Sequence, residues 1–132
     1  MDASVRREVR ERAAESCEYC GLSQIAVPAI RFHVEHILAH QHGGGDDLDN
    51  LALACPNCNW NKGPNMSARD PDTGGMEMIY NPRTQRWHQH FEFFGAEIRG
   101  LTPIGRATAR LLRFNAPERL DVRKDLPRRR KP

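Results

Sequence analysis

The stretch that decides the fold covers residues 33–62 and reads HVEHILAHQHGGGDDLDNLALACPNCNWNK. Its thirty residues hold a Glu-His pair, a glycine-rich loop, a lone Asn, a Cys-x-x-Cys pair and a further Asn. A second Cys-x-x-Cys pair, Cys17 and Cys20, lies just upstream. Cysteine pairs at this spacing are typical of metal-binding knuckles, so we expect the chain to be arranged around a metal centre.

The cysteines are predicted to hold one structural Zn²⁺ through Cys17, Cys20, Cys55 and Cys58. Two disulfides, or four ordinary buried thiols, are the alternatives. A Cys-x-x-Cys loop directs two thiolates at one tetrahedral ion, and a disulfide framework rarely uses that spacing twice. Four thiolates leave no open coordination position, so this zinc would stabilise the fold of a chain with only 39% hydrophobic residues.

The charge is unevenly distributed along the 132 residues. Residues 1–98 carry nine Lys or Arg against fourteen Asp or Glu, whereas residues 99–132 carry eleven against three. A basic arm beside an acidic, metal-binding body suits an enzyme that acts on phosphodiesters. For residues 127–132, a solvated or disordered tail is an equally good interpretation.

The first sixteen residues lack the apolar core of a secretory signal, and no apolar run approaches the length that spans a membrane. With the cysteines read as zinc ligands, a reducing, cytoplasmic setting is expected.

Local patterns predict a helix, a strand, a returning strand and a short helix in the first half of the chain. Apolar residues and opposite charges recur every four positions over residues 4–16, which indicates an exposed helix. An extended segment ends in a strand near residues 32–35, and the glycines at 43–45 form a flexible turn. Leu51–Ala54 is the returning strand. Pro56 favours a helix start, and the Gly-Pro at 63–64 ends the helix after Lys62.

Four residues of this stretch predict a catalytic centre. Glu35 and Asn59 offer the hard oxygen ligands that Mg²⁺ or Mn²⁺ prefers. His36 is suited to take a proton from water, because an ordinary imidazole titrates near neutral pH. Asn50, at the foot of the returning strand, could orient the His36 ring.

Other polar residues nearby have plainer interpretations. His33 could be a further metal ligand but is expected to have a supporting role. His40 and His42 could contact phosphate, with solvent exposure as the default. The acidic residues of the loop could suggest another cation site, yet an acidic capping segment explains them; they are Asp46, Asp47 and Asp49.

The order of these residues resembles the HNH endonucleases, whose active site is the ββα-metal (His-Me) finger. The resemblance covers residues 17–63 and rests on Glu35-His36-Ile37, the glycine loop, Asn50-Leu51, Cys55-x-x-Cys58-Asn59 and Lys62-Gly63.

The resemblance implies a β-hairpin and a helix around one divalent ion, with His36 as general base and Asn50 positioning it. Asn59, where many members have His, would bind the metal together with Glu35, where many have Asp. Lys62 matches a commonly basic position and would contact phosphate.

The second half of the chain is predicted to add a β-hairpin and a basic helix. Strands are expected at residues 76–80, 87–94 and 97–101, with the aromatic residues of the second strand in the core rather than stacked on bases. A helix is expected over residues 102–114. One of its faces presents Arg106, Arg110 and Arg113, which suit a phosphate backbone, although a merely solvated face would look the same.

We therefore expect an α+β fold: a zinc-stapled finger with an N-terminal helix over residues 1–65, and a β-hairpin plus helix extension over residues 66–132 that ends in a basic tail from about residue 118. The expected function is metal-dependent hydrolysis of DNA, in double-stranded form, by an HNH endonuclease. The alternative is a non-catalytic zinc module that binds nucleic acid or a protein partner. A shared fold does not identify the biological role of such a protein.

Overall fold

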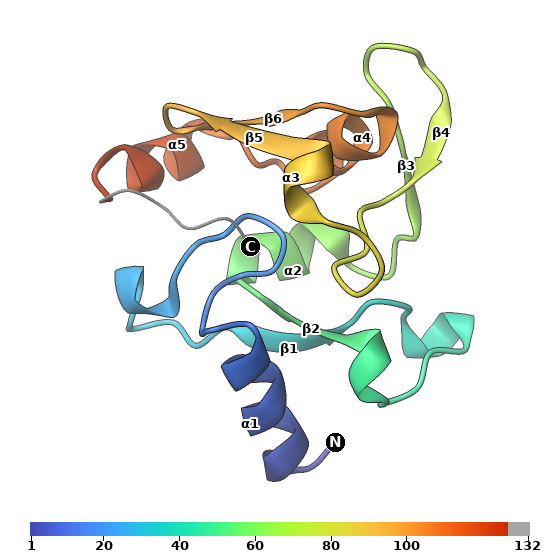
Figure 1. Cartoon of the computed structure of the whole chain (residues 1–132), viewed down its shortest axis with the longest axis vertical. Helices are drawn as coiled ribbons and strands as arrows, with labels where there is room; N and C mark the ends of the chain where they lie inside the picture. The colour runs from blue at the N-terminus through green and yellow to red at the C-terminus, as the bar shows by residue number, and fades with distance from the viewer. Residues whose placement is uncertain (127–132) are drawn as a thin grey trace.

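The computed structural model describes residues 1–126, so residues 127–132 of the expected tail lie outside it. The expected α+β class is confirmed: the chain combines helices with three separate two-stranded antiparallel sheets (Figure 1). The α-helices are α1 (Ala3–Arg12), α2 (Pro56–Lys62), α3 (Trp87–His90), α4 (Pro103–Leu111) and α5 (Pro117–Lys124). The strands are β1 (His33–His36), β2 (Leu51–Ala54), β3 (Ser67–Arg69), β4 (Met76–Met78), β5 (Phe91–Phe94) and β6 (Glu97–Gly100). Short 3-10 helices cover Gln24–Ala26, His40–His42 and Leu48–Asn50.

Helix α1 is largely exposed, as its thin apolar stripe predicts, and it buries only Val9. Its basic side chains attach it to the first hairpin: Arg10 donates to the Phe32 carbonyl at 2.6 Å and Arg12 to the Leu51 carbonyl at 2.7 Å. The helix ends earlier than residue 16, because Ala14 and Glu15 adopt positive φ angles of 53° and 54° that turn the chain toward the first cysteine pair.

The central hairpin pairs β1 with β2, with Glu35 opposite Ala52 and His36 opposite Leu51. Every residue of β2 is buried. Strand β2 and helix α2 have the predicted bounds, and β1 begins one residue later than expected. Pro56 occupies the first turn of α2, where its missing N–H has no cost.

The second half of the chain differs from prediction in how its strands pair. Strand β4 pairs with β3, which was not predicted, and β5 pairs with β6. The predicted strand at residues 87–94 is wrong in its first half, where Trp87–His90 forms helix α3. The cause is tertiary: the buried Trp87 indole donates to the Tyr19 carbonyl at 2.7 Å and its ring packs on Phe91 and Phe93. The contact with Tyr19, 68 residues away in sequence, overrides the local preference of residues 87–90 for a strand.

Two helices close the described chain. Helix α4 ends at Leu111, because Arg113 takes a positive φ of 54° that redirects the backbone before Phe114. Helix α5 then forms within the segment expected to be tail, and it buries Arg119 and Arg123. The basic arm is therefore partly structural.

One hydrophobic core draws side chains from both halves of the chain, from Val9 through Leu53 and Trp87 to Phe114. In Figure 1 the α1 and β1–β2 layer lies below α2, and the β5–β6 sheet with α3, α4 and α5 lies above it. Among residues 1–126, no helix has the length and apolarity needed to cross a membrane.

A buried carboxylate joins β3 to α4. Asp70 is fully buried and accepts two hydrogen bonds from Arg106, at 3.0 and 2.8 Å. These bonds, with smaller contributions from the turn at Thr73, hold the pKa of Asp70 far below its ordinary value.

Asp70→Asn should lower the free energy of unfolding at neutral pH, because it removes the charge that Arg106 pairs with. Since the pKa of Asp70 is depressed in the folded state, the stabilisation is complete above the unfolded carboxyl pKa of about 3.9 and is lost as the pH falls below it. Urea unfolding of both proteins should give a difference that shrinks in acid. Asp72→Asn, at the exposed second partner of Arg106, is the matched control with a smaller effect; a pH-independent difference would contradict the assignment.

Candidate functional site

The four cysteines converge on one point. Cys17, Cys20, Cys55 and Cys58 are buried free thiols whose sulfur atoms all lie within 4.8 Å of one another. The Cys20 and Cys55 sulfurs are 3.7 Å apart. With Zn–S bonds of about 2.3 Å, a tetrahedral site needs sulfur separations of about 3.8 Å. The residues therefore fit a four-thiolate zinc site, as the sequence predicted, and the disulfide alternative is wrong.

Both knuckles have the backbone geometry of metal-binding turns. The Cys20 N–H points at the Cys17 sulfur at 3.5 Å, and the Cys58 N–H points at the Cys55 sulfur at 3.4 Å. Gly21 adopts the positive φ of 80° that its place after the second cysteine requires. These N–H groups stabilise negative charge on sulfur.

A buried arginine supplies further positive charge to the cluster. Arg119 of α5 donates to the Cys58 sulfur at 3.1 Å and lies 3.7 Å from that of Cys55. Burial alone would lower the pKa of Arg119, but the cysteines beside it raise the pKa overall. Hydrogen bonds from the neighbouring thiols and the Arg119 charge hold the pKa of Cys20 well below normal. Sequence analysis missed Arg119, because it assigned this segment to a tail.

A cleft of about 490 Å³ opens between β1, the loop after it and α2. Residues from these elements line it: His33, Val34, Glu35, His36, Ala39, His40, Asn59, Trp60, Gly63 and Pro64. Three of the four predicted catalytic residues, Glu35, His36 and Asn59, thus face one cavity. Asn50 does not line it.

Glu35 is 8% exposed and already engaged on both oxygens. Oε1 accepts from the Tyr19 hydroxyl at 2.5 Å, and Oε2 lies 3.1 Å from the Lys62 ammonium. Burial raises the pKa of Glu35, while Lys62 and Tyr19 partly oppose the rise. A carboxylate offers about four lone-pair sites, so two remain for a cation in the cleft.

Lys62 does not have the exposure that the predicted phosphate contact requires. It is 1% exposed, and its ammonium donates to the carbonyls of His36 and Ile37 at 3.0 Å each in addition to pairing with Glu35. The reason is that α2 packs directly against β1. Lys62 therefore fixes the strand that carries Glu35 and His36, rather than reaching the solvent.

Asn59 is half-buried and, within residues 1–126, its side-chain amide has no hydrogen-bond partner. An unpartnered amide in a polar cleft is available to a ligand. Its oxygen, with a carboxylate nearby, suits a hard divalent cation, so the residues present fit Mg²⁺ or Mn²⁺.

His36 is paired with a residue that the sequence analysis set aside. The Nε2 atom of His36 lies 2.7 Å from Oδ1 of Asp46, and Nε2 of His40 lies 3.4 Å from the same oxygen. The hydrogen bond to His36 lowers the pKa of Asp46, which keeps that carboxyl ionised. An ionised carboxylate only accepts, so it places the imidazole proton on Nε2 and leaves Nδ1 as a base. The three side chains could also hold a metal ion. The signal in the sequence was an acidic residue directly after three glycines.

Asn50 holds the loop rather than the ring. Its amide donates to the carbonyls of Leu38 and Gly45, and its oxygen accepts from the Leu38 N–H at 2.8 Å. Gly44 is needed beside it, because a Cβ there would lie 1.7 Å from the Leu38 carbonyl oxygen. The clamp fixes the backbone one residue before Asp46.

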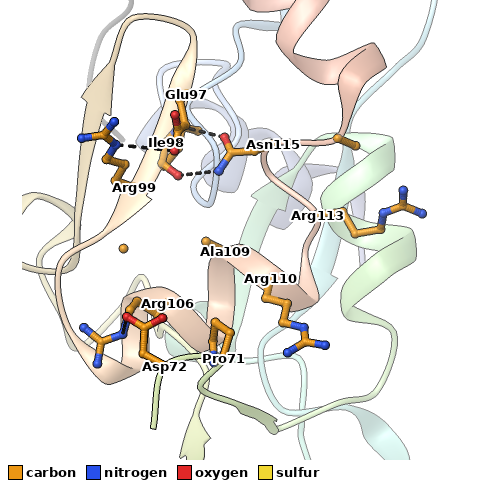
Figure 2. A pocket seen from close by; sticks show the side chains of 12 residues that line it. Pro71, Asp72, Glu97, Ile98, Arg99, Arg106, Ala109, Arg110, Arg113 and Asn115 are labelled. Carbon is orange, nitrogen blue, oxygen red and sulfur yellow. Dashed lines mark hydrogen bonds and ion pairs between the residues drawn. The ribbon is translucent and has the colours of Figure 1, made fainter. Parts of the chain in front are cut away.

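The predicted arginine stripe borders a second hollow of about 510 Å³ between β6 and α4 (Figure 2). Arg106 is held there by Asp70 and Asp72, and Arg99 lies close to Glu97. Within the described chain, the exposed side chains of Arg110 and Arg113 make no ion pair. The accessible part of the stripe therefore comprises these two arginines.

Comparison with known proteins identifies one family. Residues 17–65 match the family described as HNH endonuclease, and the predicted resemblance is confirmed. The matched segment is a nuclease-type domain that holds the cysteine cluster and the cleft. No curated protein and no solved structure matches the chain.

The contact from Arg119 should stabilise a zinc ion bound to the cysteine cluster. We expect Arg119→Gln to release zinc to a chelator faster than the unaltered protein, because a buried tetrathiolate site then lacks a counter-charge; the effect expected of such outer contacts is about 10- to 100-fold in metal affinity. Zinc release followed with a colorimetric chelator measures it. Arg123→Gln, the neighbouring buried arginine that bonds the Ala96 carbonyl, is the control. Equal release rates in the Arg119 variant and the unaltered protein would show that the contact is incidental.

Proposed function

From its HNH endonuclease segment, residues 17–65, we propose that the protein is a metal-dependent endonuclease that hydrolyses phosphodiester bonds in DNA. The observation that carries the proposal is the cleft in which the His36 imidazole, oriented by an ionised Asp46, shares a cavity with Glu35 and the unpartnered amide of Asn59. The four free thiols favour a reducing, cytoplasmic setting.

In this proposal His36 is the general base. Its Nδ1 takes a proton from water, the water oxygen attacks phosphorus, and the bond to the leaving 3′ oxygen breaks. Asp46 stabilises the imidazolium that forms, as a carboxylate does for a catalytic histidine. A divalent cation held by Glu35 and Asn59 would supply stabilisation of charge on the phosphate and the leaving oxygen.

Asn50 and Lys62 are positioning residues in this scheme. Asn50 holds the glycine loop and thereby sets where Asp46 meets the imidazole. Lys62 fixes the backbone carbonyls of His36 and Ile37 and neutralises part of the Glu35 charge. A rigid support of this kind matters because misplacement by about 1 Å can cost about 10²-fold in rate.

A non-catalytic zinc module that binds nucleic acid or protein is the second candidate. The engagement of Glu35 with Tyr19 and Lys62 favours it, because a nearby ammonium repels a cation. A cleavage assay separates the two candidates directly.

Supercoiled plasmid incubated with Mg²⁺ or Mn²⁺ should be nicked, and EDTA should stop the reaction. His36→Ala should lower the rate by about 10²- to 10⁴-fold, the usual contribution of a positioned base, while zinc content and fold persist. Asp46→Asn should cause a smaller loss, because it removes only the partner of the base. His42→Ala, an exposed histidine outside the cleft, is the matched control. Undiminished nicking by the His36 variant would exclude the assigned base.

The exposed pair Arg110 and Arg113 is proposed to contact the phosphate backbone. Arg110→Gln with Arg113→Gln should weaken DNA binding and reduce the slope of log K against log salt by roughly 2, since each duplex phosphate contact contributes about 0.9. Fluorescence anisotropy over a salt series measures the slope. Arg99→Gln is the matched control. The Arg99 guanidinium lines the same hollow but already has Glu97 beside it, so its loss should change the slope less. An unaltered slope in the double variant would remove the stripe from the interface.

A further inference from the structure

The cleft carries one feature that the proposed chemistry does not use. Trp60 is 86% exposed, whereas the chain's other tryptophan, Trp87, is 2% exposed. Trp60 follows Asn59 on α2 and lines the same cleft as His36. Tryptophan is highly buried on average, and an exposed indole that lines a polar cleft offers a large planar apolar surface to whatever enters that cleft.

The indole is carried by a firmly held helix. Cys55 caps the start of α2, Cys58 lies in its first turn, and the last residue of the helix is the buried Lys62. Both ends of α2 are thus fixed to the rest of the molecule. Trp60 is therefore presented from a rigid support, which lowers the entropy lost when a ligand stacks on the ring.

We propose that Trp60 is a stacking platform for an unpaired nucleobase next to the phosphodiester that enters the cleft. The proposal rests on the proposed nuclease function. A phosphate beside His36 has a base on either side along its strand, and every base offers a π-face to an aromatic ring. In an intact duplex those faces are covered by neighbouring bases. The preferred substrates are therefore single-stranded, gapped or branched nucleic acid, or duplex with a base turned out.

Intrinsic fluorescence reads the contact directly, because Trp87 is buried and Trp60 is exposed. The zinc-loaded His36→Ala protein, without added Mg²⁺, is titrated with a short oligothymidylate and with a blunt duplex of equal length. We expect strong quenching by the single strand and little by the duplex. Trp60→Phe in the same background should bind without that quenching. Absence of quenching at a concentration where anisotropy shows binding would overturn the proposal.

Substitutions separate stacking from general apolar contact. Trp60→Ala and Trp60→Leu should both weaken single-strand binding by about 5- to 100-fold, the range for loss of one aromatic–base stack, while Trp60→Phe retains most of it. Ile25→Ala removes an equally exposed apolar side chain, 84% exposed and outside the cleft lining, and should have no effect. Equal affinity of the Leu variant and the unaltered protein would exclude stacking.

The outcomes also separate this proposal from the nuclease proposal. One possible result is fluorescence quenching and Trp60-dependent binding, with no metal-dependent cleavage of any substrate. That result would support the stacking proposal and exclude the nuclease proposal. The opposite result is cleavage that depends on His36, with Trp60→Ala cleaving both gapped and intact duplex as fast as the unaltered protein does. That result would support the nuclease proposal and exclude the stacking proposal. A Trp60-dependent rise in molecular mass with protein concentration, and no response to oligonucleotide, would assign the indole to contact with a second copy of the chain and overturn the proposal.

Discussion

The clustering of four thiols into one buried site is the constraint on which the rest of the structure depends. The sulfur atoms come from a loop before the central hairpin and from the start of α2, so a metal ion between them would join segments separated by thirty-four residues of sequence. Four thiolates around Zn²⁺ leave a net charge of −2, and buried charge is costly unless it is compensated. Backbone N–H groups and the Arg119 guanidinium provide that compensation.

This compensation explains why the basic C-terminal segment folds back on the nuclease-type domain. Arg119 donates to the Cys58 sulfur, and Arg123 donates to the Ala96 carbonyl, so two guanidinium groups of the predicted basic tail hold α5 in place. Arg106 is likewise occupied by Asp70. Counting basic residues therefore overestimates the phosphate contacts that the described part of the arm can make; within the predicted stripe, only Arg110 and Arg113 lack an acidic partner.

Sequence reasoning succeeded where the determinants are local. The Cys-x-x-Cys spacing, the bounds of β2 and the start of α2 at Pro56 follow from residues next to one another. It failed at α3, where Trp87 turns the chain to reach Tyr19, and at Lys62, whose burial depends on how closely α2 meets β1. The Asp46–His36 pair was set aside for the same reason. Only the folded loop, with Asn50 bonded across it, brings the two together.

The same constraint accounts for what the cleft exposes. Helix α2 is fixed at one end by Cys55 and Cys58 and at the other by the Lys62–Glu35 ion pair. The helix therefore cannot rotate to bury the side chains on its outer surface. Asn59 and Trp60 remain directed at the solvent-filled cleft, one as an unpartnered amide and the other as an exposed ring. On the inner side of the helix, Asn61 donates to the Leu112 carbonyl, one residue before Arg113. Helix α2 therefore links the cysteine cluster to the cleft and to the segment at which helix α4 ends.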